Sequence, residues 1–189
     1  NITVRGSQGG TINTIFSFDR VINQGTISPD TAGRTIALNG NLTNSGLLKP
    51  LNGGNLTLQG NYTRTQLGNY NSTGGTVTLA GVLDLAGGTL ALDSASGSLS
   101  VSSGTIKGGT ITGTGGATTL FTGGGTLDAM TLGTDVTVPN GTTLEILNGL
   151  TLNNAKVTLA SSGSASTLSF NGAQTLGGAG EIFFGGLVF

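Results

Sequence analysis

The chain has 189 residues, of which 36 are glycine and only 3 are proline, and 35% of them are hydrophobic. Seven basic and eight acidic residues give a net charge of −1, and the basic residues stand singly, so no footprint for nucleic acid or an anionic membrane is predicted. Cysteine and histidine are both absent, which excludes disulfides, the commonest zinc and copper ligands and every histidine-dependent nucleophile. We therefore expect no cofactor. No stretch approaches the roughly 20 apolar residues of a membrane-spanning helix, so this segment is not expected to insert into a membrane.

The first 34 residues fit a repeat less well than the rest of the chain. Residues 2–6 read as a short strand closed by glycine, whereas Phe16, Phe18 and the pair Val21–Ile22 are larger and lie off the period of the later repeats. Terminal repeats of a solenoid are commonly atypical. We predict irregular first coils over residues 1–34, where a coil is one turn of the solenoid.

From residue 35 to residue 163 one phrase returns about every 20 residues: an alternating strand, a few small residues, then glycine. The phrases are TIALNG (35–40), NLTLQG (55–60), TVTLAG (76–81), SLSVSSG (98–104), TTLFTG (118–123), VTVPNG (136–141) and VTLASSG (157–163). A period in the twenties with one strand and one glycine turn is typical of a solenoid. Glycine suits these turns because it reaches positive φ at little steric cost.

Alternation within each phrase predicts an inward and an outward face. The predicted inward pairs are Ile36/Leu38, Leu56/Leu58, Val77/Leu79, Leu99/Val101, Val136/Val138 and Val157/Leu159, with Thr118/Leu120 as an imperfect seventh. The predicted outward residues are Ala37, Thr57, Thr78, Ser100, Thr119, Thr137 and Thr158.

Further apolar pieces in each period, such as residues 82–85 and 89–92, predict three short strands per coil, and no segment has the apolar period of a helix. The expected fold is an all-β parallel β-helix, or β-solenoid. It should form a single domain over residues 1–189, with about eight or nine three-sided coils of roughly 20 residues.

Residues 164–189 depart from the aliphatic middle and are rich in phenylalanine, which predicts an atypical terminal coil. Natural solenoids blunt the open edge of their last strands with charge, proline or a capping helix, and residues 182–189 contain none of these. We therefore predict end-to-end self-association, or contact with neighbouring segments of a longer chain. The residues expected to carry it are Phe16, Phe18, Phe183, Phe184, Val188 and Phe189.

Two longer stretches, residues 74–94 (GGTVTLAGVLDLAGGTLALDS) and 124–154, resemble the Gly/Thr/Asn-rich passenger repeats of bacterial autotransporters and filamentous-haemagglutinin-like surface proteins. The resemblance lies in the Gly/Thr/Asn-rich composition and in the repeat period, and it covers most of the chain from about Val21. It implies a right-handed coil and an extracellular or cell-surface location on a bacterium. No binding residue can be carried over from it.

The eight carboxylates are spread along the chain, and a β-helix lyase or glycosidase would need two or three of them on one face. The pairs Asp84/Asp93 and Asp128/Asp135 are the nearest in sequence, and we interpret them as isolated solvated residues. Glycine runs such as 113–116 and 123–125 lack the lysine and following helix of a phosphate-binding loop. No enzyme activity and no metal site is predicted.

The outward row Thr57, Thr78, Ser100, Thr119, Thr137 and Thr158 is the sharpest candidate binding surface. A regular ladder of hydroxyls and methyls is the kind of surface that orders water in ice-binding solenoids. The positions two residues earlier do not form a second threonine column, and threonine also simply suits an exposed strand.

The favoured function is a non-catalytic structural rod in an extracellular bacterial adhesin or surface filament. Ice binding is the first alternative, and a polysaccharide-binding or polysaccharide-cleaving β-helix is the second. The expected ligands are correspondingly a host surface, ice or a polysaccharide.

Overall fold

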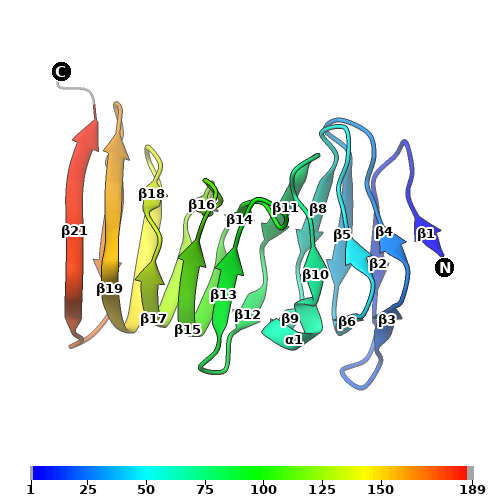
Figure 1. The fold of residues 1–189 in the computed structure, drawn as a ribbon, viewed down its shortest axis with the longest axis horizontal. Coiled ribbons are helices and arrows are strands. Elements are labelled where there is room, and N and C mark those ends of the chain that lie inside the picture. Colours follow the sequence, from blue (N-terminus) through cyan, green and yellow to red (C-terminus); the bar gives the residue numbers. More distant parts are fainter. Residues whose placement is uncertain (1, 187–189) are drawn as a thin grey trace.

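The computed structural model describes residues 2–186, which wind into about nine stacked coils along one axis (Figure 1). Every strand pairing in this part of the chain is parallel, as in Val77↔Leu56 and Leu79↔Val101. Each coil crosses three faces in a fixed order, here named C, A and B. The structure thus confirms the predicted β-solenoid of three-sided coils.

Face A is an unbroken ladder that runs the length of the molecule. It consists of β2 (Gly10–Asn13), β5 (Thr35–Asn39), β8 (Asn55–Leu58), β11 (Thr76–Leu79), β14 (Leu99–Val101), β16 (Thr119–Phe121), β18 (Val136–Val138) and the last parts of β19 (Thr143–Ser161) and β21 (Leu176–Gly186). Its strands are the repeated phrases of the sequence.

Faces B and C are built from the pieces between those phrases. Face B holds β3 (Val21–Asn23), β6 (Leu42–Asn44), β9 (Asn61–Thr63), β12 (Val82–Asp84), the first parts of β15 (Gly104–Gly113), β17 (Gly125–Gly133) and β19, and β20 (Thr167–Phe170). Face C holds β1 (Thr3–Val4), β4 (Thr26–Ile27), β7 (Leu47–Leu48), β10 (Asn69–Tyr70), β13 (Thr89–Leu92), the second parts of β15 and β17, the middle of β19 and the first part of β21.

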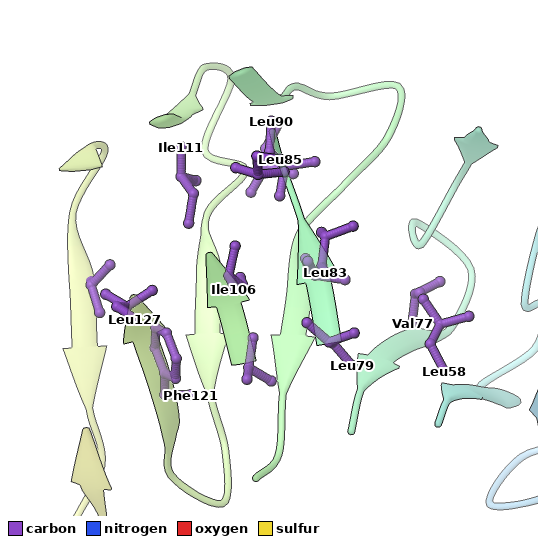
Figure 2. Packing of buried hydrophobic residues seen from close by; sticks show 14 of the residues in the cluster. Leu58, Val77, Leu79, Leu83, Leu85, Leu90, Ile106, Ile111, Phe121 and Leu127 are labelled. Carbon is purple, nitrogen blue, oxygen red and sulfur yellow. The ribbon is translucent and has the colours of Figure 1, made fainter. Parts of the chain in front are cut away.

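The core is a set of aliphatic columns inside the three faces. On face A every predicted inward pair except Thr118/Leu120 is buried, including Val77 and Leu79, which are both fully enclosed. Figure 2 shows Leu79, Leu83 and Ile106 pointing from different strands into the space between the faces. Stacking each side chain on its counterpart in the next coil removes apolar area from water, at about 25 cal/mol per Å².

Glycine closes the corner from face A to face B for a reason that the sequence analysis did not give. A Cβ on Gly60 would fall on the carbonyl oxygen of Gly40, and one on Gly81 would fall on the carbonyl oxygen of Gly60, well inside van der Waals contact. Gly60 and Gly81 do not have positive φ. At these two positions glycine is required by the close approach of successive coils.

One short helix, α1 (Arg64–Leu67), interrupts the strands between β9 and β10 and lies beside β9 (Figure 1). It begins with a capping box: Thr63 Oγ1 accepts from the Gln66 backbone N–H at 3.2 Å, and Gln66 Oε1 accepts from the Thr63 backbone N–H at 2.8 Å. Within residues 2–186 no helix has the length and apolar character to cross a membrane.

Candidate functional site

Face A has an outward row of side chains, but one of its members differs from the row that the sequence predicted. The register places Thr57, Thr78, Ser100, Leu120, Thr137 and Thr158 in one column, followed by Phe183. Ser100 is only 4% exposed, and Leu120 interrupts the hydroxyls. The face therefore does not present a continuous threonine ladder.

The assignment of Thr119 to the outward face was wrong. Thr119 is fully buried and Leu120 is 43% exposed, because Phe121 pairs with the buried Val101 and takes the inward position. A slip of one residue exchanges the faces of a whole strand. The register that forms encloses the phenylalanine ring, which has more apolar surface than leucine, and leaves Leu120 outside.

Face C carries a threonine row that the sequence analysis missed. Thr89, Thr110, Thr131 and Thr151 pair in consecutive coils, and the buried Leu90, Ile111, Leu132 and Leu152 follow them on the inner side. Spacings of 21, 21 and 20 residues between Thr-aliphatic dipeptides are the signal that could have revealed it. The row ends at Gly177 in the last coil.

The first coil leaves large apolar residues in contact with solvent. Phe16 and Phe18 are 57% and 82% exposed, and their rings stack with centroids 5.2 Å apart. The open end of the core in the first coil is a hollow of about 410 Å³. It is lined by Ile2, Val4, Ile12, Val21, Ile22, Asn23, Gln24, Gly25 and Ile27.

The last coil is open in the same way. Phe184 stands in the inward column next to Leu159, yet it is 79% exposed because no described coil covers it. Phe183 points outward, and the Lys156 ammonium lies 3.9 Å from its ring centroid. Val188 and Phe189, which were also predicted to take part in self-association, lie outside the described residues.

The carboxylates are held singly in turns and surface ion pairs. Asp84 Oδ1 accepts from the Ala86 backbone N–H at 2.8 Å and Asp84 Oδ2 lies 3.2 Å from Lys107 Nζ, and these contacts hold the pKa of Asp84 below its usual value. Asp128 accepts a hydrogen bond from Asn148 at 2.7 Å. Within residues 2–186 no three acidic residues gather where they could bind a metal ion.

A recess lies on face C between β10 and β13, two strands that no ladder joins, and nothing in the sequence pattern had marked it. Its volume is about 360 Å³. The outward residues Leu47, Asn69 and Ala91 form its floor, α1 supplies Arg64 and Gly68, and the turn after β13 supplies Asp93, Ala95 and Ser96. Tyr70 and Asn71 complete the lining.

Tyr70 is the least ordinary residue of this recess. It is 6% exposed, and its side chain stands in the inward column opposite the buried Leu48. Burial raises the pKa of Tyr70, and the Asp93 charge adds to this rise. The Arg64 charge and a hydrogen bond with the Ser96 side chain act in the opposite direction.

Comparison with protein-family models, with curated proteins and with solved structures found no match for this chain. The structure itself defines its class, which is a β-solenoid with three-sided coils.

Proposed function

We propose that this chain is a non-catalytic structural rod, a segment of an extracellular bacterial adhesin or surface filament. A rod of about nine coils at the usual strand spacing is about 40 Å long. Its scattered, individually paired carboxylates support a structural role over glycan hydrolysis, which needs two carboxyl groups on either side of one bond.

The observation that carries the proposal is the open core at both ends. Apolar residues are exposed at both ends of the core: Ile2, which lines the hollow of the first coil, is 77% exposed, and Phe184, in the inward column of the last coil, is 79% exposed. Contiguous apolar surface of this kind is typical of an interface. A further parallel coil stacked on either end would continue the three faces and bury these residues.

In a preparation of this segment alone, the partner that supplies the further coil is a second copy. Contact between one open end and the opposite open end of the next copy is head to tail and does not close, so it extends into a filament. Sedimentation velocity and electron microscopy test this. We expect species that grow with protein concentration, and rods in multiples of one segment length.

The variant Phe184→Glu sharpens the experiment. Because Phe184 is already 79% exposed, the charge should leave the fold of one copy intact while it places an unpaired carboxylate in the end-to-end contact. We expect the sedimenting species to shift to the monomer. Leu120→Ser, which removes an exposed apolar side chain from the middle of the rod, serves as the control and should change nothing. A wild-type chain that stays monomeric at high concentration would contradict the proposal.

Ice binding remains a second candidate, now favoured by the row on face C in place of the row on face A. Thr89, Thr110, Thr131 and Thr151 are in register, with hydroxyls and methyls repeated at the spacing of the coils. Thermal hysteresis of the wild-type chain tests it, with Thr110→Leu as the variant that should abolish the effect and Thr137→Leu on face A as the control. No hysteresis in the wild type excludes this function.

A further inference from the structure

The two ends of the stack present matching strand edges on face A. Within the described residues β2 pairs only with β5, and β21 pairs only with β19, so one edge of each strand is unpaired. Figure 1 shows these two strands at opposite ends of the rod. Because every ladder of the stack is parallel, β21 of one copy can pair with β2 of the next copy in the same direction.

The columns of face A fix the register of such a pairing. Phe184 ends the inward column that begins with Ile12 in the first coil, and Phe183 ends the outward column that begins with Thr11. A further coil continues both columns only if Phe184 stacks on Ile12 of the next copy and Phe183 stacks on Thr11. A slip of one residue would turn the inward side chains outward.

The two ends also differ in side-chain bulk in a complementary way. In the first coil the other inward position of β2 is Gly10, and a Cβ there would meet no atom within 4 Å. The open hollow of about 410 Å³ in this coil includes Ile12. The last coil instead carries Phe184, which is 79% exposed. A cavity of about 150 Å³ is enough to hold a benzene ring, so the hollow has room for this side chain.

The corner between face C and face A adds complementary charge. Along it the last coils alternate in sign: Asp135 Oδ1 accepts from the Lys156 backbone N–H at 2.8 Å, and Lys156 Nζ lies 3.2 Å from Glu181 Oε2. The Glu181 side chain is 57% exposed. In the first coil the connection from β1 to β2 carries Arg5, whose side chain is 72% exposed and lies 3.5 Å from Asp30. A cation is therefore the next charge of the series when a second copy follows.

We propose that copies of this chain join in one defined register, in which Phe184 of one copy enters the first-coil hollow of the next copy and Glu181 pairs with Arg5 across the junction. The inference rests on the proposed end-to-end assembly and adds to it the register and the residues in contact. Burying an aromatic side chain removes about 150–250 Å² from water, so Phe184 contributes a large apolar contact.

The absence of cysteine allows the register to be read from engineered disulfides. Adjacent coils place paired Cα atoms about 4.8 Å apart, within the roughly 4.4–6.8 Å that a disulfide spans. Phe183→Cys combined with Thr11→Cys should therefore oxidise to a ladder of linked chains on a non-reducing gel. Both side chains are exposed, so the two changes leave Phe184 and the core in place.

Phe183→Cys combined with Asn13→Cys is the matched control. Asn13 is exposed on the same strand but lies two residues further along it, about 6.6 Å, which takes the paired Cα atoms beyond the reach of a disulfide. We expect no ladder from this pair. The single variant Phe183→Cys tests a tail-to-tail contact and should give at most a minor dimer. A ladder from the Asn13 pair in place of the Thr11 pair, or a dimer in high yield from the single variant, would overturn the register.

Sedimentation velocity separates a wrong register from a failure of the rod proposal. If the wild type and the reduced variants assemble but oxidation links no Thr11 pair, this inference fails and end-to-end assembly stands. If the wild type stays monomeric, both fail together.

Arg5→Gln and Glu181→Gln measure the charged contact independently of cysteine chemistry. Each should raise the concentration at which half of the chains assemble by up to about fivefold, the range of a surface ion pair. The double variant should be no weaker than either single variant, because both changes remove the same contact. Lys107→Gln, in the middle of the rod, is the control and should assemble like the wild type. Additive losses in the double variant would mean that Arg5 and Glu181 do not meet.

Discussion

Single hydroxyl groups show where the packing of this molecule is imperfect. Ser28 and Thr119 each bury an oxygen that has no hydrogen-bond partner within residues 2–186. At Thr119 the cause is the register of its strand, since enclosing Phe121 also turns the threonine inward. The core accepts one unsatisfied hydroxyl in exchange for an enclosed aromatic ring.

Thr119→Val should stabilise the protein by about 1 kcal/mol, because valine has nearly the same shape and leaves no polar atom unpaired. Urea unfolding monitored by circular dichroism measures the change. Thr137→Val, at an exposed position on the same face, is the control and should be nearly silent. An equal response of the two variants would show that the inward position of Thr119 is incorrect.

At the scale of the element, the corner from face A to face B decides how closely coils can stack. Gly60 and Gly81 stand where the next backbone leaves no room for a side chain, whereas Gly87 has φ +81° and open space around its Cα. The same residue type is thus used for two different reasons at two corners of the coil.

Gly81→Ala should destabilise the protein by about 1–3 kcal/mol or more, because a methyl group forces two coils apart. Gly87→Ala should cost only about 1 kcal/mol, since its penalty is confined to the local backbone conformation. The two melting temperatures, measured side by side, check this ranking. The reverse order would mean that φ and not contact between coils governs the glycines of the corner.

The sequence was sufficient for the face A strands because small, regular side chains alternate cleanly there. Six of the seven inward pairs are buried, and the failure at Thr118/Leu120 came from a large residue, Phe121, that competes for the same interior place. The Thr89–Thr151 row on face C could have been predicted from the sequence by the same reasoning. The recess was not, because it depends on the missing ladder between β10 and β13 and on the way α1 and the turn after β13 both come to line it. That arrangement is set by three-dimensional stacking, which a period in the sequence does not encode.

The whole molecule has few groups whose titration is tied to folding. Burial raises the pKa values of Tyr62 and Tyr70 above those of tyrosine in an unfolded chain, which is about 10. Backbone hydrogen bonds from Ser96 and Ala95 lower the pKa of the exposed Asp93. The chain has no histidine, so its stability has no histidine-linked step near neutral pH.

The free energy of unfolding should therefore fall as the pH rises above about 10. A group whose pKa is raised by folding favours the folded state fully below the unfolded pKa, and this contribution is lost as the pH climbs toward the folded value. Denaturant titrations between about pH 8 and pH 11 measure how steeply the free energy of unfolding falls with pH. In Tyr70→Phe this slope should be smaller, and the slope that remains should come from Tyr62. An unchanged slope in that variant would argue against ionisation of Tyr70 as the cause.

Parallel stacking also determines how the segment would respond to tension. The backbone hydrogen bonds between coils run along the long axis, and equivalent residues such as Leu58 and Leu79 are 21 positions apart. A pull applied at the two ends would therefore load the outermost coil first and detach it from its neighbour while the remaining coils keep their core. Each detached coil would release about 70 Å of extended chain in place of the 4.8 Å that it occupied in the stack. Under force the rod would behave as a tether that lengthens in nearly equal steps and rewinds coil by coil when the load is removed.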